Sequence, residues 1–360
     1  MTSTTLQTIS WLVPMAAMAV IAILGHVAPD LARRELFFAI TVPAHFRDGE
    51  VGQRVLAGYR RRLWLHALLA MGLAALLLVL HRPGLLPLAL GWQMCGFVLA
   101  FFHARNETVP HAVTPTTRRE AALAPRPLTL PGGWVGVGLP FGILGATALY
   151  LKSRWDDLPA SFPVHWGLEG ADRFATRAPH TVYGSLFIGA VMCAVLIGLM
   201  VAIIRTARPV HVRGAAAAAD AARRQLILQL LAATEYFLAV EVSLVALLPL
   251  LPEELQRQAV VVLGILPLGL ALGVALMALR ARDRLDVPVE AQGGVTVGDR
   301  MADSCWKGGI FYVNPDDPAL FIEKRLGIGY TLNFGRPGAW VLIGVVILIP
   351  LVATVLGATG

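Results

Sequence analysis

Residues 182–204 read VYGSLFIGAVMCAVLIGLMVAII, an apolar run without a single charged side chain. A helix needs about 20 such residues to cross the roughly 30 Å hydrocarbon core of a bilayer. In lipid, a helix satisfies all of its own backbone hydrogen-bonding groups, which few other conformations do. This run therefore predicts a transmembrane helix.

The overall composition agrees with a membrane protein. Apolar residues make up 56% of the chain and charged residues only 15%, with a mean hydropathy of +0.67, whereas an average soluble domain is about 25% charged. The net charge of +7 fits basic loops that face anionic lipid headgroups. We therefore expect the lipid bilayer as a partner, with no nucleic acid, cofactor or metal, and a small ligand, peptide or protein as a further partner.

Other apolar runs of similar length divide the chain into about eight transmembrane helices. They cover residues 6–28, 63–80, 85–102, 134–151, 226–251, 259–279 and 339–356. The loops between them alternate in positive charge. Every second loop, taken together, holds 24 of the 30 Lys and Arg residues, and the remaining loops hold 6. The positive-inside rule makes that set cytoplasmic. We therefore predict a multi-pass cell-membrane protein with both termini outside.

The predicted outer loop at 152–181 contains the stretch LPASFPVHWGLEGADR at 158–173. Two prolines disfavour a regular helix, residues 164–166 favour a short strand, and two glycines permit a sharp reversal. One interpretation is a rigid cap on the outer membrane face. The other makes the loop a ligand, metal or proton site, although one His and one Asp are too few for zinc. The candidate residues are His165, Trp166, Asp172 and Arg173.

These residues also carry a resemblance. The order of prolines, His-Trp, two glycines and Asp-Arg between two spans resembles a bacterial domain of unknown function. That domain is also found in the N-terminal half of SdpI-type toxin-immunity membrane proteins. The resemblance implies a bacterial inner-membrane protein. It gives no reason to transfer the immunity role, because this chain has extra helices and a different C-terminal region.

A second motif lies in the last predicted cytoplasmic loop and runs from 306 to 335. Residues 310–313, 320–322 and 330–334 are β-prone, and the stretch NPDDP at 314–318 is rich in turn residues. The sequence predicts a small three-stranded element, and the motif is similar to a second short domain of unknown function. Its carboxylates serve either a cation site or the turn itself. The candidate residues are Trp306, Asn314, Asp316, Asp317, Arg325 and Asn333.

The sixth predicted span carries ionisable side chains. Glu235 lies near the membrane midplane, and Glu241 lies one to two turns further out. An ionised side chain at that depth costs about 2.5–3.5 kcal/mol, so it must be protonated, paired or facing water. Together with Gln229 and Tyr236, these residues indicate either a proton or ion relay, or hydrogen bonds that hold helices together.

We thus expect an all-α integral membrane protein with a small outer cap and a small β-containing cytoplasmic element. We divide it into a three-helix region with a basic loop and a Pro-rich linker (1–133), a SdpI-associated-type domain (134–204), a two-helix region (205–299), a cytoplasmic domain (300–336) and a last helix (337–360).

Three function hypotheses follow. The first is a non-enzymatic protein that binds or senses a ligand or toxin at the outer face. The second is a proton- or ion-coupled transporter that uses Glu235 and Glu241. The weakest is a membrane enzyme, because no phosphate-binding loop, nucleophile motif or cysteine cluster is present in the sequence.

Overall fold

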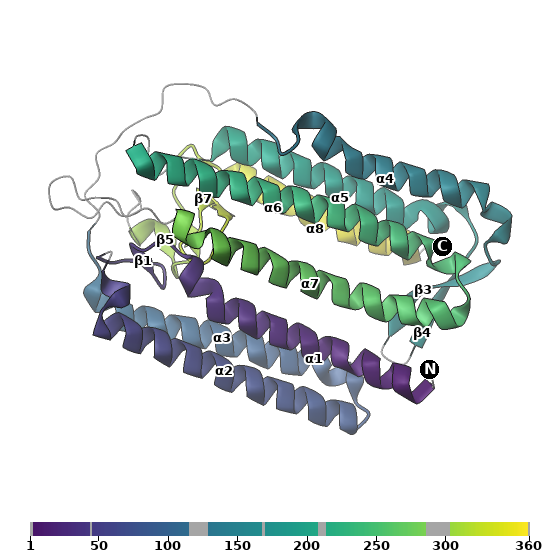
Figure 1. The fold of residues 1–360 in the computed structure, drawn as a ribbon, viewed down its shortest axis with the longest axis horizontal. Helices are drawn as coiled ribbons and strands as arrows, with labels where there is room; N and C mark the ends of the chain where they lie inside the picture. The colour runs from purple at the N-terminus through teal and green to yellow at the C-terminus, as the bar shows by residue number, and fades with distance from the viewer. Residues whose placement is uncertain are drawn as a thin grey trace.

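The computed structural model describes residues 3–43, 45–114, 129–167, 170–207, 214–285 and 303–358. Long helices dominate it (Figure 1). They are α1 (Ser3–Val27), α2 (Glu50–Val79), α3 (Leu86–Thr108), α4 (Gly133–Ser153), α5 (Pro179–Thr206), α6 (Gly214–Leu247), α7 (Glu253–Leu285) and α8 (Pro337–Ala358).

The lengths and composition of these helices confirm an all-α membrane protein. Within the described residues, seven helical segments are long and apolar enough to cross a membrane. The eighth helix, α8, has 22 residues and is therefore about 33 Å long at 1.5 Å per residue. Eight helices thus stand where about eight were predicted.

Several helices extend beyond the apolar runs that revealed them. The predicted spans leave loops at 29–62 and 103–133, and one boundary of each is wrong. The first loop ends earlier, because α2 begins at Glu50, and the second begins later, because helical structure after α3 continues to His111. Hydropathy reports the part of a helix that lies in lipid, whereas backbone hydrogen bonds carry the helix further into the polar region. Most of the predicted Pro-rich linker lies outside the described residues.

The helices form two groups (Figure 1). Helices α1, α2 and α3 pack together, and α4, α5, α6 and α8 form the second group, with α7 between α1 and α6. The α2–α3 contact is close because small side chains line it, as in many membrane helix pairs. A Cβ on Gly96 would lie 2.3 Å from the ring of His66.

Strands gather at the two ends of the helices. One end carries a hairpin of β3 (Ser161–Gly167) and β4 (Gly170–Thr176), at the same end of the helices as the first turn of α1 and the last turn of α8 (Figure 1). We call it the hairpin end. The opposite end, called the cluster end, carries β1 (Leu36–Phe37), β2 (Ile40–Thr41), β5 (Trp306–Lys307), β6 (Phe311–Tyr312), β7 (Phe321–Glu323) and β8 (Tyr330–Leu332). That the hairpin end faces outward stays a prediction.

The small β element of the second motif is present. The three predicted β-prone pieces form β6, β7 and β8, and an additional strand, β5, pairs with β6. A parallel bridge between Tyr312 and Asn333 joins the two strand pairs. The strands need support from outside, because isolated two-stranded pairs are marginally stable. Leu320 and Phe321 supply it by packing against α5 and α6.

The turn between β1 and β2 has an unusual backbone. Phe38 and Ala39 have φ values of 43° and 62°, a left-handed conformation that costs roughly 1–2 kcal/mol per residue without glycine. Their carbonyl oxygens accept hydrogen bonds from Arg105 at 3.2 and 3.0 Å, and that of Ala39 also accepts one from Arg325 at 3.3 Å. Two arginines therefore hold this turn in its strained form.

We predict that Gly309→Ala destabilises the cluster end. Gly309 has a φ of 77°, and a Cβ there would lie 2.5 Å from Nη1 of Arg105 and 2.8 Å from Cβ of Ala39. A loss of about 1–3 kcal/mol is expected from backbone strain and overpacking, measured as a lower melting temperature in detergent. The control is Gly91→Ala in α3, where a Cβ meets nothing within 4 Å. Equal melting of the two variants would contradict the packing described here.

Candidate functional site

The hairpin of β3 and β4 is fixed at its base. Nη1 of Arg177, which follows β4, donates to the carbonyl oxygens of Trp155 and Leu158 at 2.9 Å each. Thr181 lies in the first turn of α5, and its hydroxyl caps the helix by accepting from the amide of Ala178 at 3.1 Å. The hairpin is therefore held to the ends of α4 and α5 rather than free to swing.

The structure brings His165 and Asp172 together on this hairpin. Nδ1 of His165 lies 2.5 Å from Oδ1 of Asp172, and both side chains are about half exposed, at 52% and 53%. Within the described residues, no group of three or more His, Cys, Asp or Glu side chains could hold a metal ion. The pair therefore ties the two strands together at the surface.

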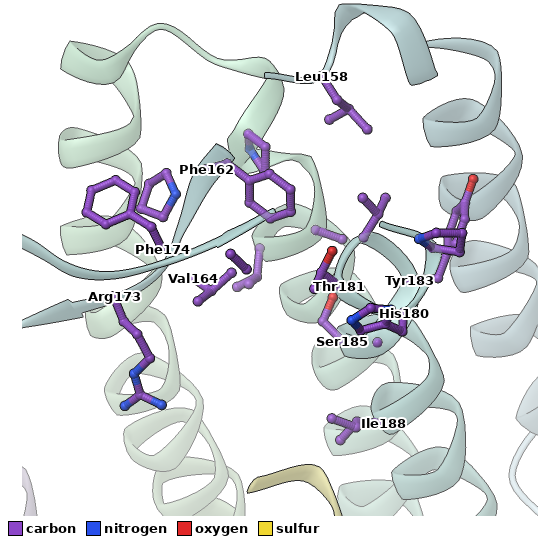
Figure 2. A pocket seen from close by; sticks show the side chains of 18 of the residues that line it. Leu158, Phe162, Val164, Arg173, Phe174, His180, Thr181, Tyr183, Ser185 and Ile188 are labelled. Atoms are coloured by element: carbon purple, nitrogen blue, oxygen red, sulfur yellow. The ribbon is translucent and has the colours of Figure 1, made fainter. Parts of the chain in front are cut away.

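A cavity of about 760 Å³ lies beneath the hairpin. The hairpin forms one wall, the first turns of α5 form another, and the end of α6 closes it (Figure 2). This volume falls in the range typical of small-molecule sites. Its apolar lining includes Phe162, Val164, Trp166, Phe174, Tyr183, Phe187, Ile188, Val245 and Pro249.

The polar groups of the cavity are few and come from two walls. Figure 2 shows Arg173 on the hairpin side and His180, Thr181 and Ser185 on α5 across from it. Of the outer-loop residues singled out in the sequence, Trp166 and Arg173 line the cavity, whereas His165 and Asp172 do not. The α5 residues were missed, although three polar side chains at the start of an apolar span were the available signal.

Glu235 occupies the middle of α6 and is fully buried. Neither of its carboxyl oxygens has a hydrogen-bond partner in the described part of the chain. Its neighbour on α5 is Cys193, whose Sγ lies 3.9 Å from the backbone oxygen of Glu235. An ionised carboxylate without a partner is far too costly in this setting, so the neutral acid is the form that fits.

The other polar residues of α6 have different surroundings. The hydroxyl of Tyr236 donates to the backbone oxygen of Gly136 in α4 at 2.5 Å, which is an interhelical bond. Gln229 is exposed and Glu241 is half-buried. The structure therefore does not gather the predicted intramembrane residues into one site. Among Gln229, Glu235, Tyr236 and Glu241, only Glu235 combines full burial with oxygens that lack a partner in the described chain.

At the cluster end, Arg33 connects three distant parts of the chain. Its guanidinium lies 2.8 Å from Oδ1 of Asp220 at the start of α6, and it also binds Glu323 in β7. A second arginine of α6, Arg223, lies with Nε 3.4 Å from Oε1 of Glu323. Burial opposes the charge of Arg33, but the carboxylates of Glu323 and Asp220 outweigh it and raise the pKa of Arg33. We call Arg33, Asp220, Arg223 and Glu323 the arginine network.

The second motif uses its polar residues internally. The buried side chain of Asn333 accepts from the amide of Asn314 at 3.0 Å and donates to three carbonyl oxygens, the shortest at 2.8 Å. Asp317 accepts from the hydroxyl of Tyr312 and the amide of Ala319, both at 3.0 Å. These contacts favour the turn interpretation over a cation site. Asp316 is exposed.

Arg325 and Trp306 form the remaining contact of the motif. The guanidinium of Arg325 lies 5.0 Å from the centre of the Trp306 ring, and its Nη1 lies 2.5 Å from Oδ1 of Asp303. Asp303 also accepts from the hydroxyl of Thr41 at 3.0 Å. Asp303 and Arg325 therefore join this region to Thr41 in β2 and to the carbonyl oxygen of Ala39 in the turn before it.

The comparisons with known proteins concern only this motif. Residues 315–340 match a family of unknown function (DUF5808). The match includes β7, β8 and the start of α8, and it supports a domain of unknown function in this region. No curated protein and no solved structure matches the chain. The resemblance of the hairpin to the SdpI-associated type stays a prediction, as do the domain boundaries.

We predict that Arg33→Met strongly destabilises the protein, because it leaves the carboxylates of Asp220 and Glu323 buried without their main counter-charge. Removing one partner of a buried pair costs about 3–5 kcal/mol, which is measured by thermal unfolding in detergent. The double variant Arg33→Met, Glu323→Met should lose less than the sum of its two single variants. The control is Arg54→Met, whose pair with Glu50 is exposed and contributes about 0.3–0.5 kcal/mol. Additive losses would contradict a coupled network.

Proposed function

We propose that the protein is a membrane receptor that binds an apolar or amphipathic ligand in the cavity beneath the β3–β4 hairpin, on the outer face of a bacterial inner membrane. The cavity carries this proposal. It combines a volume suited to a small ligand with a mostly apolar lining and a few polar groups on facing walls.

Helix α6 supplies a path from the cavity to the opposite end. Val245 and Ala246, near one end of α6, line the cavity. Asp220 and Arg223, near the other end, belong to the arginine network and contact Arg33 and Glu323. A ligand that shifts α6 would therefore act directly on the contacts between α6 and the DUF5808 match. A packed helix with defined contacts at both ends is a suitable element for such coupling.

We predict that the neutral dye N-phenyl-1-naphthylamine binds saturably to the protein in lipid nanodiscs, above its linear partitioning into lipid. Gly184→Leu should abolish the saturable fluorescence, because Gly184 lines the cavity and a side chain there meets open space. The matched control is Gly198→Leu, also in α5, also with nothing within 4 Å, and outside the cavity. Loss of saturation in both variants, or in neither, would contradict binding in this cavity.

The same dye also tests whether binding in the cavity affects the cluster end. Dye binding should change amide hydrogen exchange in β7 and β8, and Asp220→Asn should uncouple that change while the dye still binds. Asp220 is the residue of α6 that contacts Arg33, and local opening is what hydrogen exchange measures. Unchanged exchange in the dye-bound wild-type protein would leave a binding protein without a receptor role.

A second candidate function is proton-coupled transport, and the burial of Glu235 favours it. A carboxyl held neutral at mid-membrane depth can release and take up a proton when the surroundings change. The cavity reaches Val245 on α6, which is ten residues from Glu235 and hence about 15 Å along the helix. A transport cycle would therefore require α6 to move or the cavity to deepen, so we rank the receptor first.

We predict that Glu235→Gln leaves the melting temperature almost unchanged, because the amide has the shape of the neutral acid. Glu235→Lys should prevent folding, since the new cation would be buried without a partner. If the protein moves protons, pyranine-loaded liposomes will report proton flux for the wild type and none for Glu235→Gln. Strong destabilisation by Glu235→Gln would contradict a neutral Glu235, and equal flux in both proteins would exclude transport through it.

A further inference from the structure

The cavity has an uneven distribution of charge. Its one arginine is Arg173, and no acidic side chain is among its lining residues. The Arg173 side chain is exposed, and its guanidinium makes no ion pair or hydrogen bond with the described residues. The neighbouring carboxylate of Asp172 pairs with His165 instead. A cation beside apolar walls without a counter-ion of its own attracts an anionic group.

The rest of the lining describes the other part of the ligand. Phe174 and Phe187 are 61% and 66% exposed in the absence of lipid, and both line the cavity. Phe187 lies eight residues into α5, about 12 Å from its first residue, at a depth where hydrocarbon surrounds the helix. We therefore expect the cavity to border lipid along one side, and its apolar walls suit a flexible hydrocarbon chain.

We propose that the ligand is a single-chain anionic amphiphile, with its charged headgroup at Arg173 and its chain against Phe174, Phe187 and Val245. The hydroxyl of Ser185 and the ring of His180 line the α5 wall of the same cavity and can donate further hydrogen bonds to the headgroup. This inference rests on the proposed function, since it requires the cavity to be the binding site. A volume of about 760 Å³ matches a compact ligand, of the size that small-molecule sites enclose.

The charge of the ligand separates this inference from the alternatives. A neutral amphiphile would leave the Arg173 charge unpaired, and a cationic one would meet repulsion. Free inorganic phosphate would satisfy Arg173 but leave the apolar walls unused, and apolar burial supplies most of the affinity in such a site. A hydrocarbon chain with an anionic headgroup therefore binds more tightly than a neutral ligand or a free anion, because it uses both features of the lining.

The test uses three probes with one chain: 12-bromododecyl phosphate, 12-bromododecanol and 12-bromododecyltrimethylammonium. Each is added to the full-length protein in phosphatidylcholine nanodiscs. Bromine quenches tryptophan fluorescence at short range, and Trp166 lines the cavity. The part of the quenching that is lost in the Trp166→Phe variant therefore reports occupancy of the cavity by the probe. We expect saturable quenching by the phosphate probe, at least about 10-fold weaker binding of the other two probes, and no competition from inorganic phosphate.

Variants that each remove one positive charge show which residue binds the anionic headgroup. Arg173→Gln should weaken the phosphate probe about 10-fold or more and leave the alcohol unchanged, because only the anion loses a partner. The control is Lys152→Gln, which removes the same charge from an exposed site at the hairpin end and outside the cavity. Circular dichroism and size-exclusion profiles show whether each variant is folded.

The outcomes distinguish the two proposals. Equal binding of the three probes, all abolished by Gly184→Leu, would overturn the anionic class and keep the cavity as a binding site. Quenching that Gly184→Leu does not affect would overturn both. Competition by inorganic phosphate at concentrations similar to those of the phosphate probe would show an anion site without a role for the chain, and would also overturn the inference.

Discussion

The charge of Arg33 must be neutralised almost out of contact with water, and this constraint fixes the cluster end of the molecule. Its side chain is 9% exposed, and the carboxylates that neutralise it come from α6 and β7. In sequence they lie 187 and 290 residues away. A buried charge tolerates no loss of its partners, so these segments must stay together. The β element, α6 and the loop between α1 and α2 that carries Arg33 therefore form one unit. Arg105 of α3 and Arg325 join the N-terminal helices to this unit through the turn at Phe38 and Ala39.

The lipid constraint explains what could be predicted. Apolar length is a local property, so residues 182–204 and the other runs revealed the helices, and the β-prone pieces of the second motif revealed β6, β7 and β8. Helix bounds were less accurate, because polar residues such as Glu50 and Glu107 extend helices without adding hydropathy. The arginine network could not be predicted, since nothing near Arg33 in sequence indicates Asp220 or Glu323. The cavity could be predicted only in part: Trp166 and Arg173 were identified, but His180, Thr181 and Ser185 at the boundary between the outer loop and the apolar run 182–204 were not, because nothing local indicates that the hairpin folds over them.

The two loop motifs illustrate how the same residue types take different roles. In the second motif, Asn333 and Asp317 direct their polar atoms inward to backbone groups that strands would otherwise satisfy. Short loops that pass over helix ends need such acceptors, because unpaired buried backbone groups are costly. In the hairpin, β3 and β4 pair their own backbones, so the side chains are free for other contacts. The side chain of Arg173 is therefore not needed to satisfy backbone groups, whereas that of Asp317 is.

Helix α6 has contacts in both of these regions, and the proposed receptor function depends on it. It carries Asp220 in the arginine network, Glu235 at its centre and Val245 at the cavity. A rotation of α6 would break the bond of Tyr236 to α4 and the contacts of Asp220 together. A small translation along its axis is less costly, because packed helices slide by an ångström or two without losing their interface. Glu235 adds no bond that resists such sliding, since its carboxyl oxygens have no partner in the described chain. In the proposed receptor, a neutral, unpaired carboxyl at the centre of α6 would therefore let the helix shift along its axis between the cavity and the arginine network.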